Sequence, residues 1–147
     1  MTTFKDLGLS PEIQQAIDEI GFDTPSPIQE EAIPPLLAGH DVIGQAQTGT
    51  GKTAAFGLPM LQYLDPDNDE VQAVVLTPTR ELCIQVTQAI RSYAEHLDIH
   101  VVAVFGGAPI RGQQAQLRSG AHVIVATVGR MKDLISRRSI VLTAARF

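Results

Sequence analysis

The sequence predicts an α/β fold in which helices cover both faces of a parallel sheet. Three short apolar runs rich in β-branched residues, Ala73–Thr77, Val101–Phe105 and Val123–Ala126, are typical of strands buried on both faces. Helical stretches alternate with these runs, at Arg80 to about His96, Ile110 to Arg118 and Met131 to about Ser136. This alternation favours parallel strands joined by right-handed crossovers. Ligand-binding loops are then expected at the carboxyl ends of the strands.

Two capped helices are predicted before the first of these strands. One begins at Ser10-Pro11, where a serine cap precedes a proline suited to the first helical position, and ends at Gly21. Ser26-Pro27 repeats the start signal. The helix that begins there is expected to run until Pro34-Pro35 or Gly39 interrupts it.

A phosphate-binding loop is the strongest functional motif in the chain. It consists of Ala46, Gln47, Thr48, Gly49, Thr50, Gly51, Lys52 and Thr53. The apolar pair Val42-Ile43 is expected to form a strand before this loop, and Thr53–Phe56 to continue it as a helix. The glycines let successive N–H groups turn toward phosphate oxygens, Lys52 would reach the β and γ phosphates, and the Thr53 hydroxyl would bind magnesium. A glycine-rich turn with an incidental lysine is the alternative interpretation.

Length and composition indicate one domain of an ordinary globular class. The chain has 147 residues, a net charge of −5 and one cysteine, Cys83, which we expect to be a small buried hydrophobe in a helix. No segment has the length of apolar sequence that spans a bilayer, and no secretory signal is visible, so the expected location is the cytoplasm and no membrane partner is expected. Residues 1–100 carry four basic and fifteen acidic side chains, whereas residues 101–147 carry seven basic and one acidic. This asymmetry indicates an anion-facing surface or solvated helix faces.

Together these motifs resemble the N-terminal RecA-like domain of DEAD-box RNA helicases, from Phe4 to Phe147. The phosphate loop has the form A-x-T-G-x-G-K-T of that family, including Ala46 where the general motif has glycine. The segment Gly21–Gln29 is similar to the family's Q motif. The resemblance implies that Gln29 reads the adenine edge, that Phe4 stacks on the adenine ring and that Phe22 belongs to the same nucleotide site. From the residues alone, an amide can pair with adenine, but Gln29 could equally be a polar residue of a capped helix.

Three further loops resemble the family's motifs Ia, GG and Ib, which hold the sugar–phosphate backbone of RNA. The residues implied in RNA binding are Pro78, Thr79, Arg80, Gly106, Gly107, Thr127, Gly129 and Arg130. Hydroxyls, exposed N–H groups and arginine suit phosphate and do not read base identity. Each motif taken singly also fits a plain turn or a helix terminus.

The chain departs from the family pattern in two ways. Val128 stands where the family usually has proline, so the loop before the next helix loses a fixed φ angle. The sequence also stops before the family's Asp-Glu-Ala-Asp motif, its third motif and its second domain. We therefore interpret residues 1–39 as a helical segment with the Q motif, and residues 40–147 as an incomplete RecA-like P-loop domain.

The predicted function is that of the ATP- and RNA-binding part of an ATP-dependent RNA helicase. Its expected ligands are ATP or ADP, Mg²⁺ and RNA, with Lys52 and Thr53 as the catalytic residues that are present. Alone, the chain is expected to bind without efficient hydrolysis, and to be marginally stable or to self-associate through an uncovered sheet edge. A regulatory or vestigial binding fragment is the alternative, and a small kinase or GTPase lacks supporting motifs.

Overall fold

The computed structural model describes residues 2–49 and 51–147, which pack into two compact units. Unit 1 contains residues 2–49, 51–63 and 89–98, and unit 2 contains residues 64–88 and 99–147. The phosphate loop thus packs with the N-terminal helices. The proposed boundary after residue 39 stays a prediction about domain organisation.

Unit 1 is helical. It contains the 3₁₀ helix η1 (Phe4–Leu7), α1 (Pro11–Ile20), α2 (Pro27–Leu37), α3 (Lys52–Gln62) and the final part of α4 (Arg80–Tyr93). Its core consists of fully buried side chains from these elements: Phe4, Ile13, Ile17, Ile33, Leu58, Met60 and Ile90. The predicted caps are present, since the Ser10 side chain accepts a hydrogen bond from Ile13 N and Gly21 takes a left-handed conformation after α1.

Helix α2 runs through Pro34 and Pro35 to Leu37 and is not ended by the prolines. A proline removes one backbone donor and leaves the carbonyl four residues earlier without its partner. Those carbonyls belong to Glu30 and Glu31, which are exposed, so water can hydrate them. This exposure explains why the helix tolerates both prolines.

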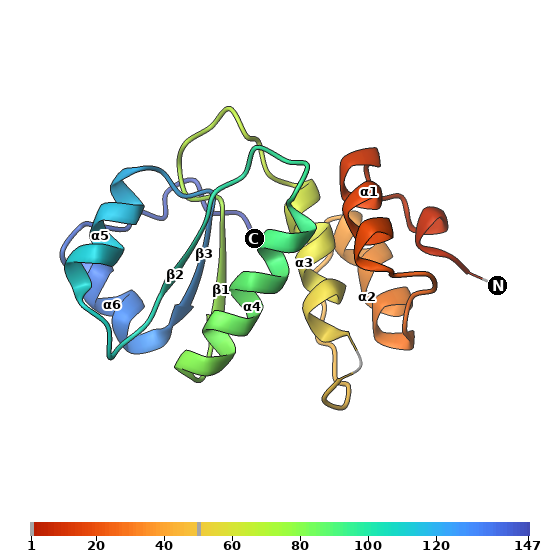
Figure 1. The fold of residues 1–147 in the computed structure, drawn as a ribbon, viewed down its shortest axis with the longest axis horizontal. Helices are drawn as coiled ribbons and strands as arrows, with labels where there is room; N and C mark the ends of the chain where they lie inside the picture. Colours follow the sequence, from red (N-terminus) through yellow and green to blue (C-terminus); the bar gives the residue numbers. More distant parts are fainter. Residues whose placement is uncertain (1, 50) are drawn as a thin grey trace. The chain divides into compact units, whose positions relative to one another are not determined.

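Unit 2 is built on a parallel sheet of three strands in the order β1-β3-β2 (Figure 1). The strands are β1 (Ala73–Thr77), β2 (Val101–Val104) and β3 (Val123–Thr127), and the helices α5 (Ile110–Arg118) and α6 (Val128–Ser136) follow β2 and β3. In the register, Thr77 lies opposite Thr127, and Val104 lies opposite Ala126. The strands therefore end at one common edge, as predicted for a parallel sheet.

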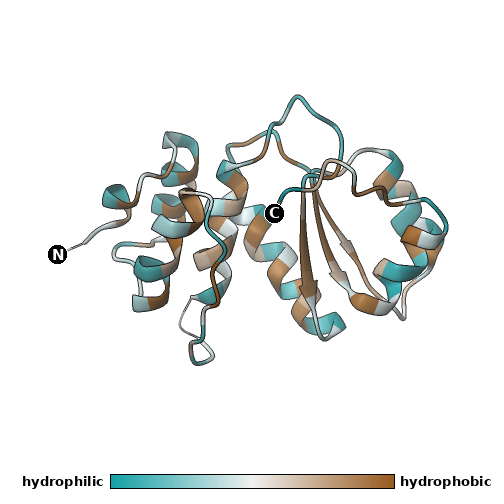
Figure 2. Cartoon of the chain, turned by 180° about the vertical axis from the view of Figure 1, so that it is seen from behind, coloured by the Kyte–Doolittle hydropathy of each residue, from teal (hydrophilic) through white to brown (hydrophobic). Residues whose placement is uncertain are grey.

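Helices cover both faces of this sheet, as predicted. On one face Val102, Val104, Ile124 and Ala126 join Met131 and Leu134 of α6 in a buried cluster, with Ile110 and Leu117 of α5 packed against it. On the other face, Cys83 of α4 donates to the carbonyl oxygen of Val125 at 3.2 Å. Figure 2 shows the strands coloured as hydrophobic along their length, which agrees with burial on both faces.

The strand expected at Val42-Ile43 is absent, so this prediction was wrong. Residues 41–47 have no regular structure, and the Ile43 side chain is fully exposed. A strand forms only when its N–H and C=O groups pair with a neighbouring strand, and a short apolar run cannot supply that neighbour. No pairing partner for this run is found in residues 2–49 and 51–147.

No described helix is long and apolar enough to cross a membrane.

Candidate functional site

The phosphate loop leads directly into α3. Gly51 is the residue before the helix, and Lys52 and Thr53 are its first two residues. Gly49 and Gly51 have φ angles of 82° and 83°, in the left-handed region that glycine adopts without strain. The first N–H groups of a helix lack intrahelical acceptors and carry partial positive charge, so they suit an anion. Thr50 lies outside the described residues; Lys52 is exposed and Thr53 is half-buried.

Gln29 connects the Q-motif segment to this loop within unit 1. Its Nε2 donates to the carbonyl oxygen of Gly51 at 3.1 Å, and its Oε1 accepts from Ser26 N at 2.9 Å. The side chain is buried, with 5% of its surface exposed. A Cβ atom on Gly51 would collide with the Gln29 amide. The structure therefore places Gln29 in contact with the loop, and adenine reading stays a prediction.

The aromatic residues of the expected nucleotide site pack on each other. The Phe4 and Phe22 rings are stacked with centroids 5.8 Å apart, and Phe22 also lies 6.0 Å from Tyr93. Phe4 is 2% exposed, whereas Phe22 is half-buried. The contact of Phe4 is thus with a protein ring, and its stacking on a base stays a prediction.

In unit 2, the predicted RNA-binding motifs lie on loops at the common edge of the sheet. Arg80 begins α4 and donates from Nη1 to the carbonyl oxygen of Gly107 at 3.4 Å, while its guanidinium lies 5.0 Å from the centroid of the Phe105 ring. Thr79 caps α4, since its Oγ1 accepts from Leu82 N at 3.1 Å. Motif Ia and the GG motif are therefore in direct contact through Arg80.

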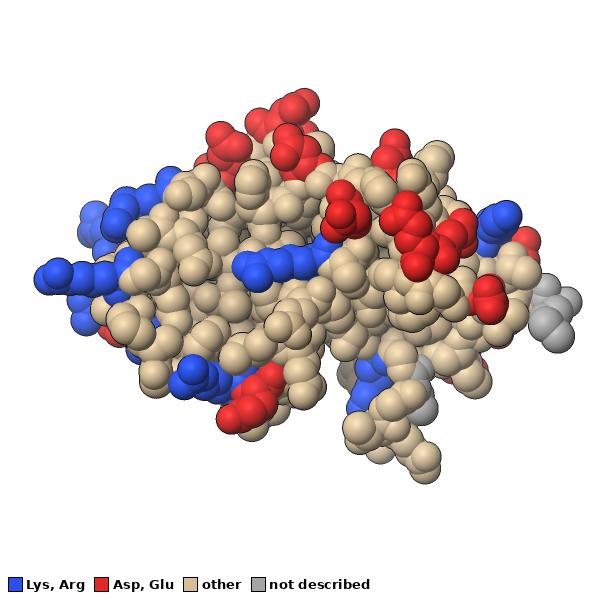
Figure 3. All heavy atoms as spheres, in the orientation of Figure 1, with Lys and Arg blue, Asp and Glu red and all other residues tan. Residues whose placement is uncertain are grey.

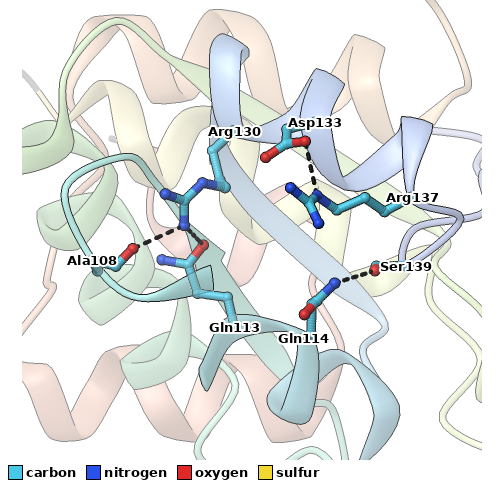
Figure 4. A network of polar contacts seen from close by, with 7 residues as sticks. All are labelled: Ala108, Gln113, Gln114, Arg130, Asp133, Arg137 and Ser139. Carbon is cyan, nitrogen blue, oxygen red and sulfur yellow. Dashed lines mark hydrogen bonds and ion pairs between the residues drawn. The ribbon is translucent and has the colours of Figure 1, made fainter. Parts of the chain in front are cut away.

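Motif Ib contacts the same GG loop through a second arginine (Figure 4). The Nη1 atom of Arg130 donates to the carbonyl oxygen of Ala108 at 3.1 Å and to Oε1 of Gln113 at 2.9 Å. Gln113 in turn donates from Nε2 to the carbonyl oxygen of Phe105 at 3.0 Å. The loop of residues 105–108 is thus held by Arg80 and by the pair Arg130 and Gln113.

The remaining predicted RNA-binding residues flank these contacts. Pro78, Gly106 and Gly129 are exposed, and Thr127 is half-buried as the residue before α6. Helix α6 begins at Val128, three residues earlier than predicted, because Thr127 is extended and the helix continues without a break into Met131. Val128 therefore occupies the first helical position and not a free loop.

Sequence reasoning missed Gln113 and Phe105. Gln113 is 5% exposed and lies three residues after Ile110 and four before Leu117, on the face of α5 that packs on the sheet. A polar residue at an apolar position of an amphipathic helix is a usable signal, because burial obliges the amide to find hydrogen-bond partners.

Basic side chains of unit 2 gather over α5, α6 and the segment that follows. Their members are Arg111, Arg118, Arg130, Lys132, Arg137 and Arg138. Figure 3 shows basic side chains at the left of the view, where α5 and α6 lie in Figure 1, and acidic side chains at the top, where Figure 1 has the turn at residues 65–70. Within this unit, the basic side chains and the acidic turn are therefore separated in space.

Comparisons with known proteins agree with this arrangement. Residues 26–147 match the DEAD/DEAH box helicase family. The chain is 46% identical over 140 residues to the DEAD-box ATP-dependent RNA helicase CshA of Bacillus cereus, covering 95% of this chain and 27% of that protein. It is 48% identical over 143 residues to the ATP-dependent RNA helicase DeaD of Escherichia coli, covering 97% and 23%. The chain spans about a quarter of the length of these relatives.

Solved structures of DEAD-box proteins also match this chain. A DEAD box protein from the hyperthermophile Methanococcus jannaschii matches with a TM-score of 0.93 and 36% identity, over 99% of this chain and 40% of that one. Dbp5 of Saccharomyces cerevisiae, solved with RNA and ADP BeF3, matches with a TM-score of 0.87 and 36% identity, over 99% and 37%. With the family match extending over most of its length, the α/β chain described here belongs to the DEAD/DEAH box helicase family.

Proposed function

We propose that this chain binds ATP or ADP and RNA as part of an ATP-dependent RNA helicase. The observation that carries the nucleotide half of this proposal is the glycine loop before α3, which presents helical N–H groups beside Lys52 and is tied to Gln29. Family membership and the RNA bound in the related Dbp5 structure support the RNA half.

The phosphate loop fits a magnesium nucleotide through a small set of groups. Lys52 would place a positive charge on the β and γ phosphates, and the Thr53 hydroxyl would supply one oxygen ligand to Mg²⁺. When bound beside the Thr53 hydroxyl, Mg²⁺ would neutralise charge on the phosphate oxygens. The left-handed Gly51 lets Gln29 approach the loop closely, because a Cβ atom on Gly51 would collide with the Gln29 amide.

Hydrolysis is expected to be inefficient in these 147 residues tested alone. Phosphoryl transfer needs a metal-binding carboxylate in addition to the Thr53 hydroxyl, and groups that place the attacking water; the resemblance assigns both to family motifs that these 147 residues do not include. Losing them should cost at least ~10²–10⁴ in rate.

A cytoplasmic location is proposed on composition.

Calorimetry with ADP and GDP tests nucleotide binding and base selection together. We expect ADP to bind more tightly, because Gln29 can pair with the adenine edge. We expect Lys52→Ala to weaken ADP binding by about tenfold or more through loss of a charge at the phosphates. Lys5→Ala is the matched control, because Lys5 is exposed on η1 of the same unit.

Each outcome bears on a separate part of the proposal. Unchanged ADP affinity in Lys52→Ala would show that the loop is not the site. Equal ADP and GDP affinities would remove the base-reading role of Gln29. The ratio of ADP affinity to GDP affinity is therefore the informative quantity. A substitution of Gln29 would be harder to interpret, because Gln29 also donates to the Gly51 carbonyl and its loss would disturb the loop.

RNA binding is expected to be weak, nearly independent of sequence and steeply dependent on salt. Contacts to phosphates release counterions, so log affinity falls linearly with log salt concentration. A titration with single-stranded oligouridylate and oligoadenylate at several salt concentrations measures both properties. A flat salt response or a strong preference for one base would contradict backbone recognition.

A further inference from the structure

Gln113 is a buried polar side chain whose amide joins two loops. It lies on α5 with 5% of its surface exposed, donates to Phe105 O at 3.0 Å and accepts from Arg130 Nη1 at 2.9 Å. Both ends of the amide are thus satisfied by groups that belong to, or contact, the predicted RNA-binding loops. An apolar side chain of similar volume would pack on the sheet equally well, so packing does not require the amide.

Among the described residues, the Arg130 guanidinium has no carboxylate partner, and part of its set of N–H donors makes no hydrogen bond. Both acceptors of its Nη1 atom, Ala108 O and Gln113 Oε1, are neutral. The nearby carboxylate of Asp133 pairs instead with Nε of Arg137 at 2.9 Å, as Figure 4 shows. Within the described chain, no hydrogen bond is made by Nε or Nη2 of Arg130. A planar guanidinium held on one side can still bind a phosphate through its other edge.

We propose that Gln113 is a positioning residue for RNA, which it does not itself contact. It orients Arg130 and fixes the loop of residues 105–108 in one geometry, so that motif Ib and the GG loop meet consecutive phosphates together. This inference rests on the proposed RNA-binding function. The physical gain is preorganisation, because an arginine and a loop already ordered lose less conformational entropy when RNA binds.

The central experiment compares Gln113→Met with Gln114→Met in the full chain. Methionine keeps the volume of glutamine and removes its hydrogen bonds. Gln114 is the next residue of α5, and its Nε2 donates to Ser139 Oγ at 3.1 Å and not to either loop. With fluorescent oligouridylate as the probe, we expect Gln113→Met to weaken binding about fivefold and Gln114→Met to change it by less than about twofold.

The salt dependence separates positioning from general damage. If Arg130 loses its phosphate contact in Gln113→Met, the slope of log affinity against log salt should shrink by about 0.7, the value for one phosphate of a single strand. Misfolding lowers the competent fraction equally at every salt concentration and leaves the slope unchanged. In an Arg130→Ala background, Gln113→Met should cause a smaller loss than in the wild type, because only its bond to the loop of residues 105–108 then remains to be removed. A lower affinity with an unchanged slope, or an unchanged affinity, would overturn the proposal.

A second variant keeps the test decisive if Gln113→Met does not fold. In Gln113→Glu the carboxylate can still accept from Arg130, but it neutralises the guanidinium and cannot donate to Phe105 O. We expect weaker RNA binding and a smaller slope, and wild-type affinity would again overturn the inference. If the wild-type chain itself binds no oligouridylate, the proposed RNA-binding function fails. If the wild-type chain binds oligouridylate and the Gln113 variants bind it equally well, only the positioning role of Gln113 fails.

Discussion

Gly51 is required both by its left-handed backbone conformation and by the close contact of its loop with Gln29. Its φ angle of 83° is one that other residues adopt only with strain, and its carbonyl accepts from Gln29. Gly49 has nearly the same φ angle, 82°, but a Cβ atom there would meet no atom within 4 Å. Alanine variants at the two positions therefore distinguish the free-energy cost of backbone strain, which both share, from the cost of steric collision, which only Gly51 has.

We predict that Gly51→Ala destabilises the chain more than Gly49→Ala does. The left-handed conformation should cost about 1–2 kcal/mol in either variant, and displacement of the Gln29 amide should add about 1–3 kcal/mol in Gly51→Ala. Denaturant unfolding measures both. Adding Gln29→Ala to Gly51→Ala should recover part of the loss, and equal costs for the two glycine variants would show that the collision is relieved by local movement.

Val128 is the first residue of α6, 53% exposed, at the position where proline is most acceptable in a helix. We predict that Val128→Pro stabilises the chain by about 0.4–1 kcal/mol, because it restricts the unfolded chain at a compatible φ angle. It should also tighten RNA binding modestly by stiffening the start of the helix that carries Arg130. Val128→Ala is the control, since it removes the branched side chain without fixing φ; destabilisation by proline would contradict this reasoning.

At the scale of elements, α4 is anchored to the sheet through Cys83. This residue has no exposed surface and donates to Val125 O, which confirms the expected buried position. Burial raises the pKa of the Cys83 thiol, so the thiol stays protonated at neutral pH in the folded chain. Since the thiolate is the reactive form, both burial and protonation oppose chemical modification.

We predict that Cys83 reacts with iodoacetamide at least about 100-fold more slowly in the native chain than in the unfolded chain at pH 8. The difference arises because the reagent must wait for α4 to open from the sheet. Because the thiol reacts from the opened state, the native rate should rise with pH in parallel with the rate of the unfolded chain. Equal native and denatured rates, followed by mass spectrometry, would mean that α4 is not held on the sheet.

At the scale of the whole molecule, the sheet of unit 2 has an uncovered apolar position. Strand β1 lies at one end of the order β1-β3-β2, and its Leu76 is 58% exposed. Backbone bonds from the last two residues reach the start of this edge, where Arg146 N donates to Gln72 O at 2.9 Å and Val74 N donates to Phe147 O at 3.0 Å. Exposed apolar edge strands promote association between chains.

We predict concentration-dependent self-association that Leu76→Lys reduces. A charge on the edge strand makes pairing with a second chain costly. The matched control is Leu82→Lys, because Leu82 is 39% exposed but lies on α4 and not on a strand. Sedimentation velocity over a range of concentrations distinguishes the outcomes. A wild-type chain that remains monomeric throughout would show that this edge does not mediate association.

Local signals in the sequence determined most of the elements. The caps at Ser10 and Gly21, the apolar runs of β1, β2 and β3, and the phosphate-loop motif each act within a few residues, so they can be read without knowing the fold. Alternation of strand and helix then determined the parallel sheet and the common edge of its loops. The family was predictable for the same reason, since its motifs are short and ordered along the chain.

Tertiary structure decided what depends on distant partners. Val42-Ile43 has strand-like composition but no neighbour to pair with, so it stays irregular and exposed. Gln29 meets Gly51 across 22 residues, and Gln113 meets Arg130 across 17. In the sequence, a polar residue can equally be a helix cap, a solvated side chain or a bridge between segments. Only the fold places its hydrogen-bond partner within reach. Packing therefore decided the hydrogen-bond partners of these glutamines, because a hydrogen bond needs both partners within about 3 Å.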